Sequence, residues 1–153
     1  MSGITRGLSM SKAAEFCELI VDDDGRIACW VCQNLAMPEY AAESVCALGF
    51  LYKKRLIGGV VFGNYRQNRD IWLTIYTNDK HWCNRRILKT IFKLAFEFFN
   101  CRRVSILITE DNAASLSLTK RLGFRKEGRL RQFREDGKDA YVLGMLKEEC
   151  NFL

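Results

Sequence analysis

Two cysteines in the stretch CWVC, Cys29 and Cys32, have the spacing that redox and zinc sites use. A zinc site needs further ligands, yet no second CxxC follows, and the single histidine, His81, is far away in the sequence. The chain has seven cysteines and its first residues do not read as an export signal, so we expect reduced thiols rather than a disulfide framework. The pattern predicts buried cysteines on a helix and no metal site.

A second candidate for chemistry is the stretch NAASLSLTKRLGFRKEG, residues 112–128. Asn112, or Asp111 before it, can accept hydrogen bonds from the free amides at the start of a helix. Gly123 can adopt the left-handed conformation that ends a helix, after which Phe124 folds back onto it. The stretch therefore predicts a capped, amphipathic helix that leads into a strand.

Positive charge is unevenly placed along the chain. The net charge is +6, and residues 80–153 hold 16 Lys and Arg against 9 Asp and Glu, whereas residues 1–79 hold 8 against 9. The second half should attract an anion, such as a nucleic acid, an acidic protein or a phosphorylated cofactor. Within it, RKEGRLRQFRED carries alternating arginines around Phe133. This segment is either the polar face of a hairpin or a nucleic-acid surface with one aromatic ring for stacking.

The elements that must position these groups follow from apolar periodicity. Helical spacing occurs at 10–20, at 26–36, where Pro38 should stop the helix, and at 85–100. Strand patterns occur at 44–52 and 56–65, which read as an antiparallel hairpin, at 70–77, at the nearly continuous apolar run 102–109, and at 124–133 and 139–147. The alternation predicts one α/β layered domain over residues 1–153.

Sheets of this class bind ligands beyond the carboxyl ends of their strands. Two such ends precede helix starts here, at 77–85 and 109–112, and free amides together with the helix dipole favour an anion at each. The chain has no run of roughly eighteen apolar residues, the length that a membrane span needs. We therefore expect a cytoplasmic protein without a membrane partner.

The order of elements, with the Asn112 segment after a buried strand, resembles the GNAT superfamily of N-acetyltransferases. It is most similar to the branch that includes the ribosomal-protein N-terminal acetyltransferases. The similarity covers roughly residues 44–149 and includes the LIGGVVF hairpin and the 82–86 segment. Its other supporting residues are Asn112, Ser115, Arg121, Gly123, Phe124, Glu127, Gly128, Tyr141, Met145 and Glu148. The resemblance implies a central mixed, largely antiparallel sheet of about six to seven strands flanked by about four helices.

The resemblance further implies transfer of acetyl from acetyl-CoA, as co-substrate, to a primary amine by direct attack in a ternary complex. Backbone amides near Ile75 and Tyr76 would hold the pantetheine and the carbonyl, and Asn112 and Ser115 would meet the pantetheine arm or its thiol end. The pyrophosphate would lie at the helix start made by His81, Trp82, Cys83, Asn84, Arg85, Arg86 and Ile87. The expected catalytic residues are Glu110, Tyr76 and Asn112. Glu110, or Asp111 beside it, would be the base that deprotonates the amine, and Tyr76 and Glu39 are further options for it. The alternative for Glu110 is a solvated or capping carboxylate.

Two departures from the family pattern stand out. The family's pyrophosphate loop usually reads Q/R-x-x-G-x-G/A, whereas residues 81–86 read HWCNRR. Asn84 can still cap the helix, and Arg85 or Arg86 can offer charge-assisted bonds in place of close amide contacts. The alternative is a solvated basic face. Many relatives also place a tyrosine where this chain has Thr119, and threonine is a poor acid for protonating a thiolate.

The acceptor is not specified by these residues. Its pocket would be built by the N-terminal helices, the 34–44 loop and the last hairpin. The resemblance allows a protein N-terminus, a lysine, a small molecule or a modified nucleotide, and it places the last hairpin beside the acceptor site, where its arginines would select an acidic or phosphate-bearing acceptor. Two other functions remain alternatives: a non-catalytic acetyltransferase-like module that binds nucleic acid, and an enzyme that modifies nucleobases or nucleotides on this scaffold. No oligomeric state is predicted.

Overall fold

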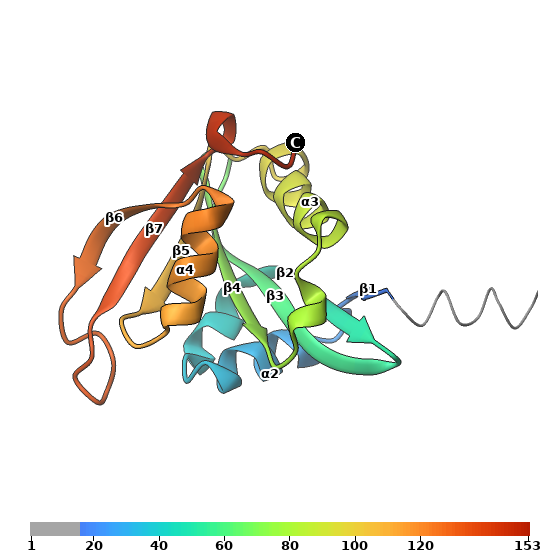
Figure 1. Ribbon diagram of the computed structural model, residues 1–153, viewed down its shortest axis with the longest axis horizontal. Helices are drawn as coiled ribbons and strands as arrows, with labels where there is room; N and C mark the ends of the chain where they lie inside the picture. The colour runs from blue at the N-terminus through green and yellow to red at the C-terminus, as the bar shows by residue number, and fades with distance from the viewer. Residues whose placement is uncertain (1–15) are drawn as a thin grey trace, which may run out of the picture.

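Seven strands form one twisted sheet in the computed structural model, which describes residues 16–153 (Figure 1). The strands are β1 (Glu18–Val21), β2 (Ser44–Tyr52), β3 (Arg55–Arg66), β4 (Asp70–Thr77), β5 (Arg103–Thr109), β6 (Arg125–Leu130) and β7 (Ala140–Leu146). Their order across the sheet is β1-β2-β3-β4-β5-β7-β6, and every neighbouring pair is antiparallel except the parallel pair β4 and β5. The mixed, largely antiparallel sheet expected from the sequence is confirmed.

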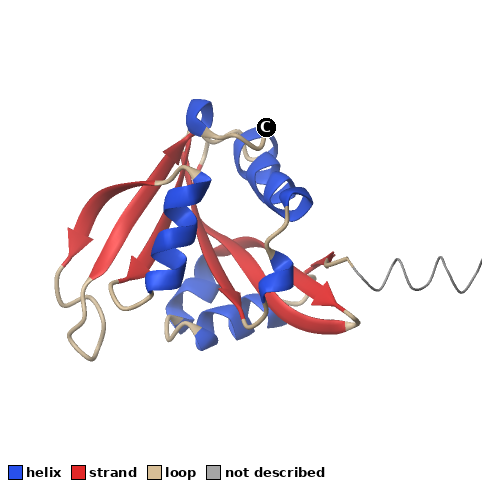
Figure 2. Ribbon diagram, in the orientation of Figure 1, coloured by secondary structure: helices blue, strands red, loops and turns tan. Residues whose placement is uncertain are grey.

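Helices cover both faces of this sheet. The α-helices within the described residues are α2 (Arg26–Asn34), α3 (Arg85–Lys93) and α4 (Ala113–Leu122), and the shorter helical turns are η1 (Pro38–Glu43), η2 (Lys80–Trp82), η3 (Leu94–Phe98) and η4 (Lys147–Glu149). In Figure 2, α3 and α4 lie over the same face, with β4 visible between them. The main core packs against α3, whereas α2 packs on the other face against Ala47 and Val61. None of the helices within residues 16–153 is long and apolar enough to cross a membrane.

The helix predicted over 10–20 is wrong where the structure can test it. Residues 18–21 form the edge strand β1, paired antiparallel with β2 so that Glu18 lies opposite Leu51 and Val21 opposite Leu48. The remaining residues of that prediction, 10–15, lie outside the described part of the chain. Pairing with an open sheet edge satisfies the backbone here and overrides a helical apolar spacing.

Two other helices end earlier than predicted. The helix α2 ends at Asn34, because Ala36 adopts a left-handed φ of 55°, and Pro38 starts the next helical turn rather than stopping this one. The predicted helix over 85–100 is α-helical only to Lys93 and continues as the wider π-helical turn η3, in which the amide of Phe99 donates to the carbonyl of Leu94 at 2.8 Å. The extra residue per turn leaves Phe98 exposed at the helix end.

The helix α4 has the ends that its sequence predicts. The side chain of Asn112 accepts a hydrogen bond from the amide of Ser115 at 3.2 Å, and Gly123 has a left-handed φ of 107°. Phe124 then returns to the core at 6% exposure. Both caps are local interactions, which explains why sequence spacing predicts them well.

Candidate active site

The parallel strands β4 and β5 separate halfway along their length. Their pairing runs only from Asp70 opposite Arg103 to Leu73 opposite Ile106, although β4 continues to Thr77 and β5 to its own end at residue 109. Beyond the last pair the two strands no longer share ladder hydrogen bonds. A wedge therefore opens in the middle of the sheet at the carboxyl ends of its two parallel strands, where ligands bind in sheets of this class.

Alternation of hydrogen bonds along β4 identifies the backbone groups that face the wedge. The amide of Asn78 donates to the carbonyl of Ile57 in β3 at 2.9 Å. Backbone groups of every second residue in a strand face the same neighbour, and the pairing of β3 with β4 is regular here, so the backbone of Tyr76 also bonds to β3. The amide of Ile75 must then point the other way, toward β5. The same alternation on β5 turns the backbone of Leu107 toward β4. The Ile75 amide and the Leu107 carbonyl thus lie at the wedge without a ladder partner.

The wedge opens into a cleft of about 430 Å³ on the face covered by α3 and α4. Its lining is mostly apolar and comes from both strands, both helices and the segment after α2: Asn34, Leu35, Met37, Leu73, Thr74, Ile75, Tyr76, Thr77, Trp82, Leu88, Ile91, Phe92, Ile106, Leu107, Ile108, Thr109, Asn112, Ala114, Ser115, Leu118, Thr119, Leu122 and Phe124. The cleft brings together five residues predicted from the sequence: Ile75, Tyr76, Trp82, Asn112 and Ser115. An apolar slot with a few polar groups is typical of a small-molecule site.

The hydroxyl of Thr119 lines this cleft but is fully engaged. It donates to the carbonyl of Ser115 at 2.8 Å, has the carbonyl of Leu116 at 3.1 Å, and is 5% exposed. A hydroxyl held by its own helix in this way offers no proton to the cleft. This agrees with the expectation that the threonine is not an acid here.

The two arginines of the predicted pyrophosphate loop contact the terminal segments of the chain. Arg85 donates to the carbonyl of Asn151 at 3.3 Å, and Arg86 donates to the carbonyl of Cys17 at 2.6 Å. Neither side chain lines the cleft. The side chain of Asn84 caps α3, as predicted, by accepting from the third amide of the helix at 3.0 Å.

His81 has a structural environment outside the cleft. Its ring stacks on Tyr52 with centroids 4.1 Å apart, and Nδ1 lies 2.5 Å from a carboxylate oxygen of Asp79. The backbone amide and the ring of His81 lower the pKa of Asp79. These contacts fix the turn between β4 and α3.

The rest of the loop divides between core and surface. Trp82 is buried, stacks on Phe50 at 5.3 Å between centroids, and forms one wall of the cleft. Ile87, in the first turn of α3, is completely buried, and Cys83 is exposed. Of the seven residues predicted for the pyrophosphate loop, only Trp82 therefore lines the cleft.

Glu110 and Tyr76, two of the predicted base candidates, occupy different environments. Glu110 does not line the cleft: its carboxylate accepts from the amide of Asp139 at 3.0 Å and lies 3.9 Å from Arg129. It therefore supports the last hairpin. Tyr76 does line the cleft, and its ring meets Trp30 edge to face at 5.3 Å between centroids.

A second, smaller hollow of about 170 Å³ lies on the opposite face, beneath η1 and the last hairpin. It is lined by Met37, Tyr40, Glu43, Val61, Gly63, Asn64, Trp72, Leu73, Thr74, Leu107, Leu130 and Phe133. Four of these residues, Met37, Leu73, Thr74 and Leu107, also line the cleft. The two cavities therefore adjoin at the wedge, one on each side of the sheet.

Acidic groups stand beside this hollow. Burial raises the pKa of Tyr40, and the neighbouring carboxylates of Glu39 and Glu43 raise it further. Both carboxylates are exposed, and Glu43 contributes to the lining. Negative charge at this opening favours a cationic ligand, although the net charge of the whole chain is +6.

The basic hairpin, by contrast, is largely neutralised within the chain. Three of its four arginines form ion pairs with neighbouring acids: Arg125 with Glu149 at 3.1 Å, Arg129 with Asp139 at 2.5 Å and Arg134 with Asp111 at 3.4 Å. The fourth, Arg131, is exposed. Lys126 lies over the ring of Tyr141 at 3.9 Å. These contacts favour the interpretation of a polar hairpin face over that of a nucleic-acid surface.

The CWVC pair forms no joint site. Cys32 is buried on α2 as predicted, and burial raises the pKa of its thiol to about 11, but Cys29 is exposed, so the prediction is wrong for that residue. All seven cysteines are free, and within residues 16–153 no cluster of three or more His, Cys, Asp or Glu side chains could hold a metal ion.

Comparison with known proteins decides the family. Residues 38–141 match the family model described as the acetyltransferase (GNAT) domain. The chain belongs to the GNAT acetyltransferase family. The matched residues run from η1 to the start of β7 and contain the wedge. They also contain every residue that lines the two cavities except Asn34, Leu35 and Met37.

Individual GNAT relatives are named for polyamines. A probable spermine N(1)-acetyltransferase of Bacillus subtilis subsp. natto is 27% identical over 93 residues, which are 54% of this chain and 61% of the relative. The spermine/spermidine N(1)-acetyltransferase of Bacillus subtilis strain 168 is 25% identical over the same shares. The match thus spans about three fifths of the length of these relatives. The finer resemblance to the ribosomal-protein branch finds no support among them.

Solved structures share the GNAT fold. A mutant form of spermidine N-acetyltransferase SpeG from Vibrio cholerae has a TM-score of 0.68 at 15% identity, covering 90% of this chain and 96% of that one. A crystal structure of a probable acetyltransferase has a TM-score of 0.62 at 21% identity, covering 78% and 74%. The fold prediction made from the order of elements is confirmed.

The sequence placed the acceptor pocket only by segment, at the N-terminal helices, the 34–44 loop and the last hairpin, and it did not single out several residues that line the smaller hollow. Tyr40, Glu43 and Met37 lie in or before the short turn η1, which has no periodic pattern, and Leu107 looked like an ordinary residue of a buried strand. The only available signal was a tyrosine between two glutamates directly after Pro38.

Proposed function

We propose that this GNAT chain is an acetyl-CoA-dependent N-acetyltransferase that acts on a small polyamine-type primary amine. The observation that carries the proposal is the pair of cavities that adjoin at the wedge between β4 and β5. One cavity is an apolar cleft under two helices, and the other is a hollow beside two carboxylates. Two reactants that enter from opposite faces of the sheet could meet at the wedge, and such positioning lowers the barrier of a bimolecular reaction.

The helix-side cleft fits the pantetheine arm of acetyl-CoA. Its apolar walls suit the arm, and the Ile75 amide and Leu107 carbonyl are available to its amide groups. When bound, acetyl-CoA would supply an acetyl group activated as a thioester. The Ile75 amide can donate to an oxygen on which negative charge develops. The first amides of α3, next to the Asn84 cap, remain available for phosphate.

The acceptor-side hollow fits one end of a polyamine. A polyamine carries several ammonium groups, and Glu43 with nearby Glu39 can hold one of them while another amine reaches the wedge. The aromatic walls Tyr40 and Phe133 suit the alkyl segments between amines. Of the predicted bases, Tyr76 is the one that lines the cleft, so we assign the proton-accepting role to the phenolate form of Tyr76. The phenolate would take the proton released by the attacking amine, directly or through water, while CoA leaves as its thiolate.

A pair of substitutions tests whether the cleft holds acetyl-CoA. Ala114 lines the cleft and is exposed, whereas its neighbour Ala113 is exposed but does not line it. Titration calorimetry should show acetyl-CoA binding to the unmodified protein and to Ala113→Trp, and at least about tenfold weaker binding to Ala114→Trp. Equal affinities of the two variants, or no binding to the unmodified chain, would remove the basis of the proposal.

A further inference from the structure

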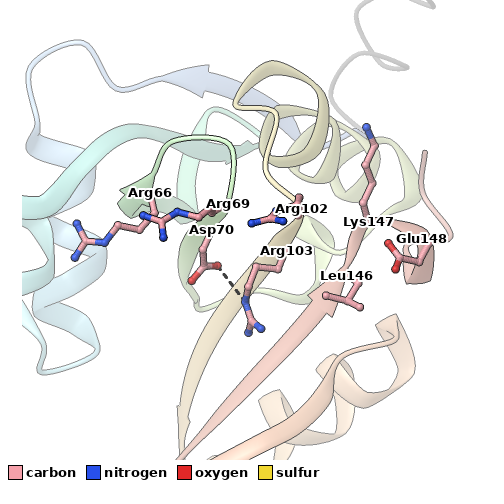
Figure 3. Close-up of a pocket in the computed structure, with 8 residues that line it drawn as sticks. All are labelled: Arg66, Arg69, Asp70, Arg102, Arg103, Leu146, Lys147 and Glu148. Carbon is pink, nitrogen blue, oxygen red and sulfur yellow. Dashed lines mark ion pairs between the residues drawn. The ribbon is translucent and has the colours of Figure 1, made fainter.

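A second concentration of charge lies at the end of the sheet opposite the cleft (Figure 3). Here β3 ends, β4 and β5 begin and β7 ends, around an open hollow of about 680 Å³. Its lining consists of Arg66, Arg69, Asp70, Arg102, Arg103, Leu146, Lys147 and Glu148. Five positive and two negative side chains therefore surround one depression. Neither the acetyl-transfer cleft nor the acceptor hollow shares any of these residues.

Most of the positive charge in this hollow is not neutralised by the protein. Arg103 pairs with Glu127 and lies 3.5 Å from Asp70, whose carboxylate also accepts from the hydroxyl of Ser105 at 2.8 Å. Asp70 is thereby used internally. The other four cations, Arg66, Arg69, Arg102 and Lys147, form no ion pair within residues 16–153. Like charges gathered without partners repel one another, and a bound anion would relieve that repulsion.

Backbone hydrogen bonds hold the bases of three of these side chains in place. The carbonyl of Arg69 accepts from the amides of Arg102 and Arg103 at 3.0 and 3.1 Å, and the carbonyl of Arg102 accepts from the amide of Lys147 at 3.0 Å. In Figure 3 the labelled residues come from three separate chain segments, and the side chains of Arg66 and Lys147 extend away from the others. The charged groups are therefore supported by paired strand ends rather than by a free loop.

The residues that line the hollow indicate which class of anion can bind there. The amides of Arg102, Arg103 and Lys147 are already bonded to carbonyls, so they cannot cradle a single phosphate. The hollow is wide, its cations are spread, and no aromatic ring lines it, so nucleobases have no stacking partner. We propose that this hollow, the basic strand-end site, binds a small oligophosphate, recognised through a chain of two or more phosphate groups by Arg69, Arg102 and their neighbours.

Titration calorimetry with inorganic tripolyphosphate at low salt tests the basic strand-end site. The unmodified chain should bind one equivalent, with an affinity that falls as salt is added. Arg69→Gln/Arg102→Gln should weaken binding at least about tenfold, because two charge-assisted contacts are lost. Arg66→Gln/Lys147→Gln should weaken it in the same direction. Lys89→Gln/Lys93→Gln removes the same charge from the exposed side of α3 and should leave affinity within about twofold.

The same titration with the Ala114→Trp variant separates this site from the cleft. The affinity for tripolyphosphate should be unchanged by Ala114→Trp, because Ala114 lines only the cleft. A nucleoside triphosphate should bind within about threefold of tripolyphosphate, since no residue reads the base. The proposal is overturned by loss of tripolyphosphate binding in Ala114→Trp, by equal affinity of Arg69→Gln/Arg102→Gln and the unmodified chain, or by binding of long nucleic acid without binding of tripolyphosphate. None of these outcomes depends on whether the chain transfers acetyl groups.

Discussion

Asn112 has two roles that one residue type can combine. Its side chain caps α4 by accepting from the amide of Ser115, and the same residue lines the cleft. Asn112→Ala should lower the free energy of unfolding by about 1 kcal/mol, because an orphan helix amide loses its partner. Asn112→Ser restores a capping oxygen without the carboxamide. Urea unfolding should therefore give a lower free energy of unfolding for Asn112→Ala than for Asn112→Ser. An Asn112→Ala variant as stable as the unmodified chain would show that the cap contributes nothing.

Glu43 is expected to attract the acceptor. Glu43→Gln keeps the shape of the side chain and removes its charge, so the KM for spermidine should rise by about three- to tenfold while kcat changes less. Glu97→Gln is the matched control, since Glu97 is exposed on η3 and lines neither cavity. Steady-state kinetics at low and high salt would measure this. If Glu97→Gln raised the KM for spermidine as much as Glu43→Gln does, only the net charge of the protein would matter, and the proposed role of Glu43 would be contradicted.

The buried thiols predict a loss of stability at alkaline pH. Burial raises the pKa values of Cys32 and Cys101 from 9.0 to about 11. Below pH 9.0 both the folded and the unfolded chain keep these protons, so the thiols add no pH dependence. Between pH 9.0 and 11 the unfolded chain releases protons that the folded chain retains, so the free energy of unfolding falls as pH rises. Urea unfolding should show a steeper fall for the unmodified chain than for Cys32→Ala/Cys101→Ala, and parallel curves would contradict this.

At the scale of elements, the approach of α2 to the sheet depends on a missing side chain. A Cβ added at Gly59 would lie 2.8 Å from Val31 on α2 and 2.9 Å from the carbonyl oxygen of Leu48. The carbonyl belongs to the paired strand β2 and cannot move aside. Gly59→Ala should therefore destabilise the fold by about 1–3 kcal/mol. Gly128→Ala is the control, because nothing lies within 4 Å of its added Cβ. Equal melting temperatures for the two variants would argue against close packing of α2.

Elements with local signals were predictable, and those that depend on distant partners were not. The caps at Asn84, Asn112 and Gly123 involve groups a few residues apart, so spacing predicted them. The edge strand β1 and the π-helical turn η3 depend on the neighbouring strand and the core, and sequence periodicity gave the wrong structure for both. The wedge between β4 and β5 is likewise invisible in sequence, since the register of the two strands is a property of the whole sheet.

The same limit explains the uneven outcome for the site. Ile75 and Tyr76 lie in the last residues of β4, and Asn112 and Ser115 follow the end of β5, at places that a family pattern locates. All four line the cleft. The charged candidates do not line the cleft, because a long charged side chain can reach many alternative partners. Arg85 and Arg86 reach the terminal segments, and Glu110 reaches the last hairpin. Their catalytic or phosphate-binding roles stay predictions, whereas their structural contacts are specific.

On the scale of the whole molecule, negative and positive side chains gather at different surfaces. The acceptor hollow has carboxylates at its opening, and three arginines of the basic hairpin are paired with acids. Cations without an ion pair within residues 16–153 gather at the basic strand-end site. A chain of net charge +6 can thus admit a cationic amine at one end of the sheet and an anion at the other. The two functions proposed for these ends are separable by the substitutions described above.

Acetyl transfer itself is the most direct test of the central claim. The chain should be incubated with acetyl-CoA and, in parallel, with spermidine or a peptide that has a free N-terminus, and the products read by mass spectrometry. We predict spermidine that gains one acetyl group, with the peptide modified at least about tenfold more slowly. Ala114→Trp should abolish the product and Ala113→Trp should retain it. Acetyl-CoA binding without acetylated spermidine, or faster acetylation of the peptide, would contradict the account.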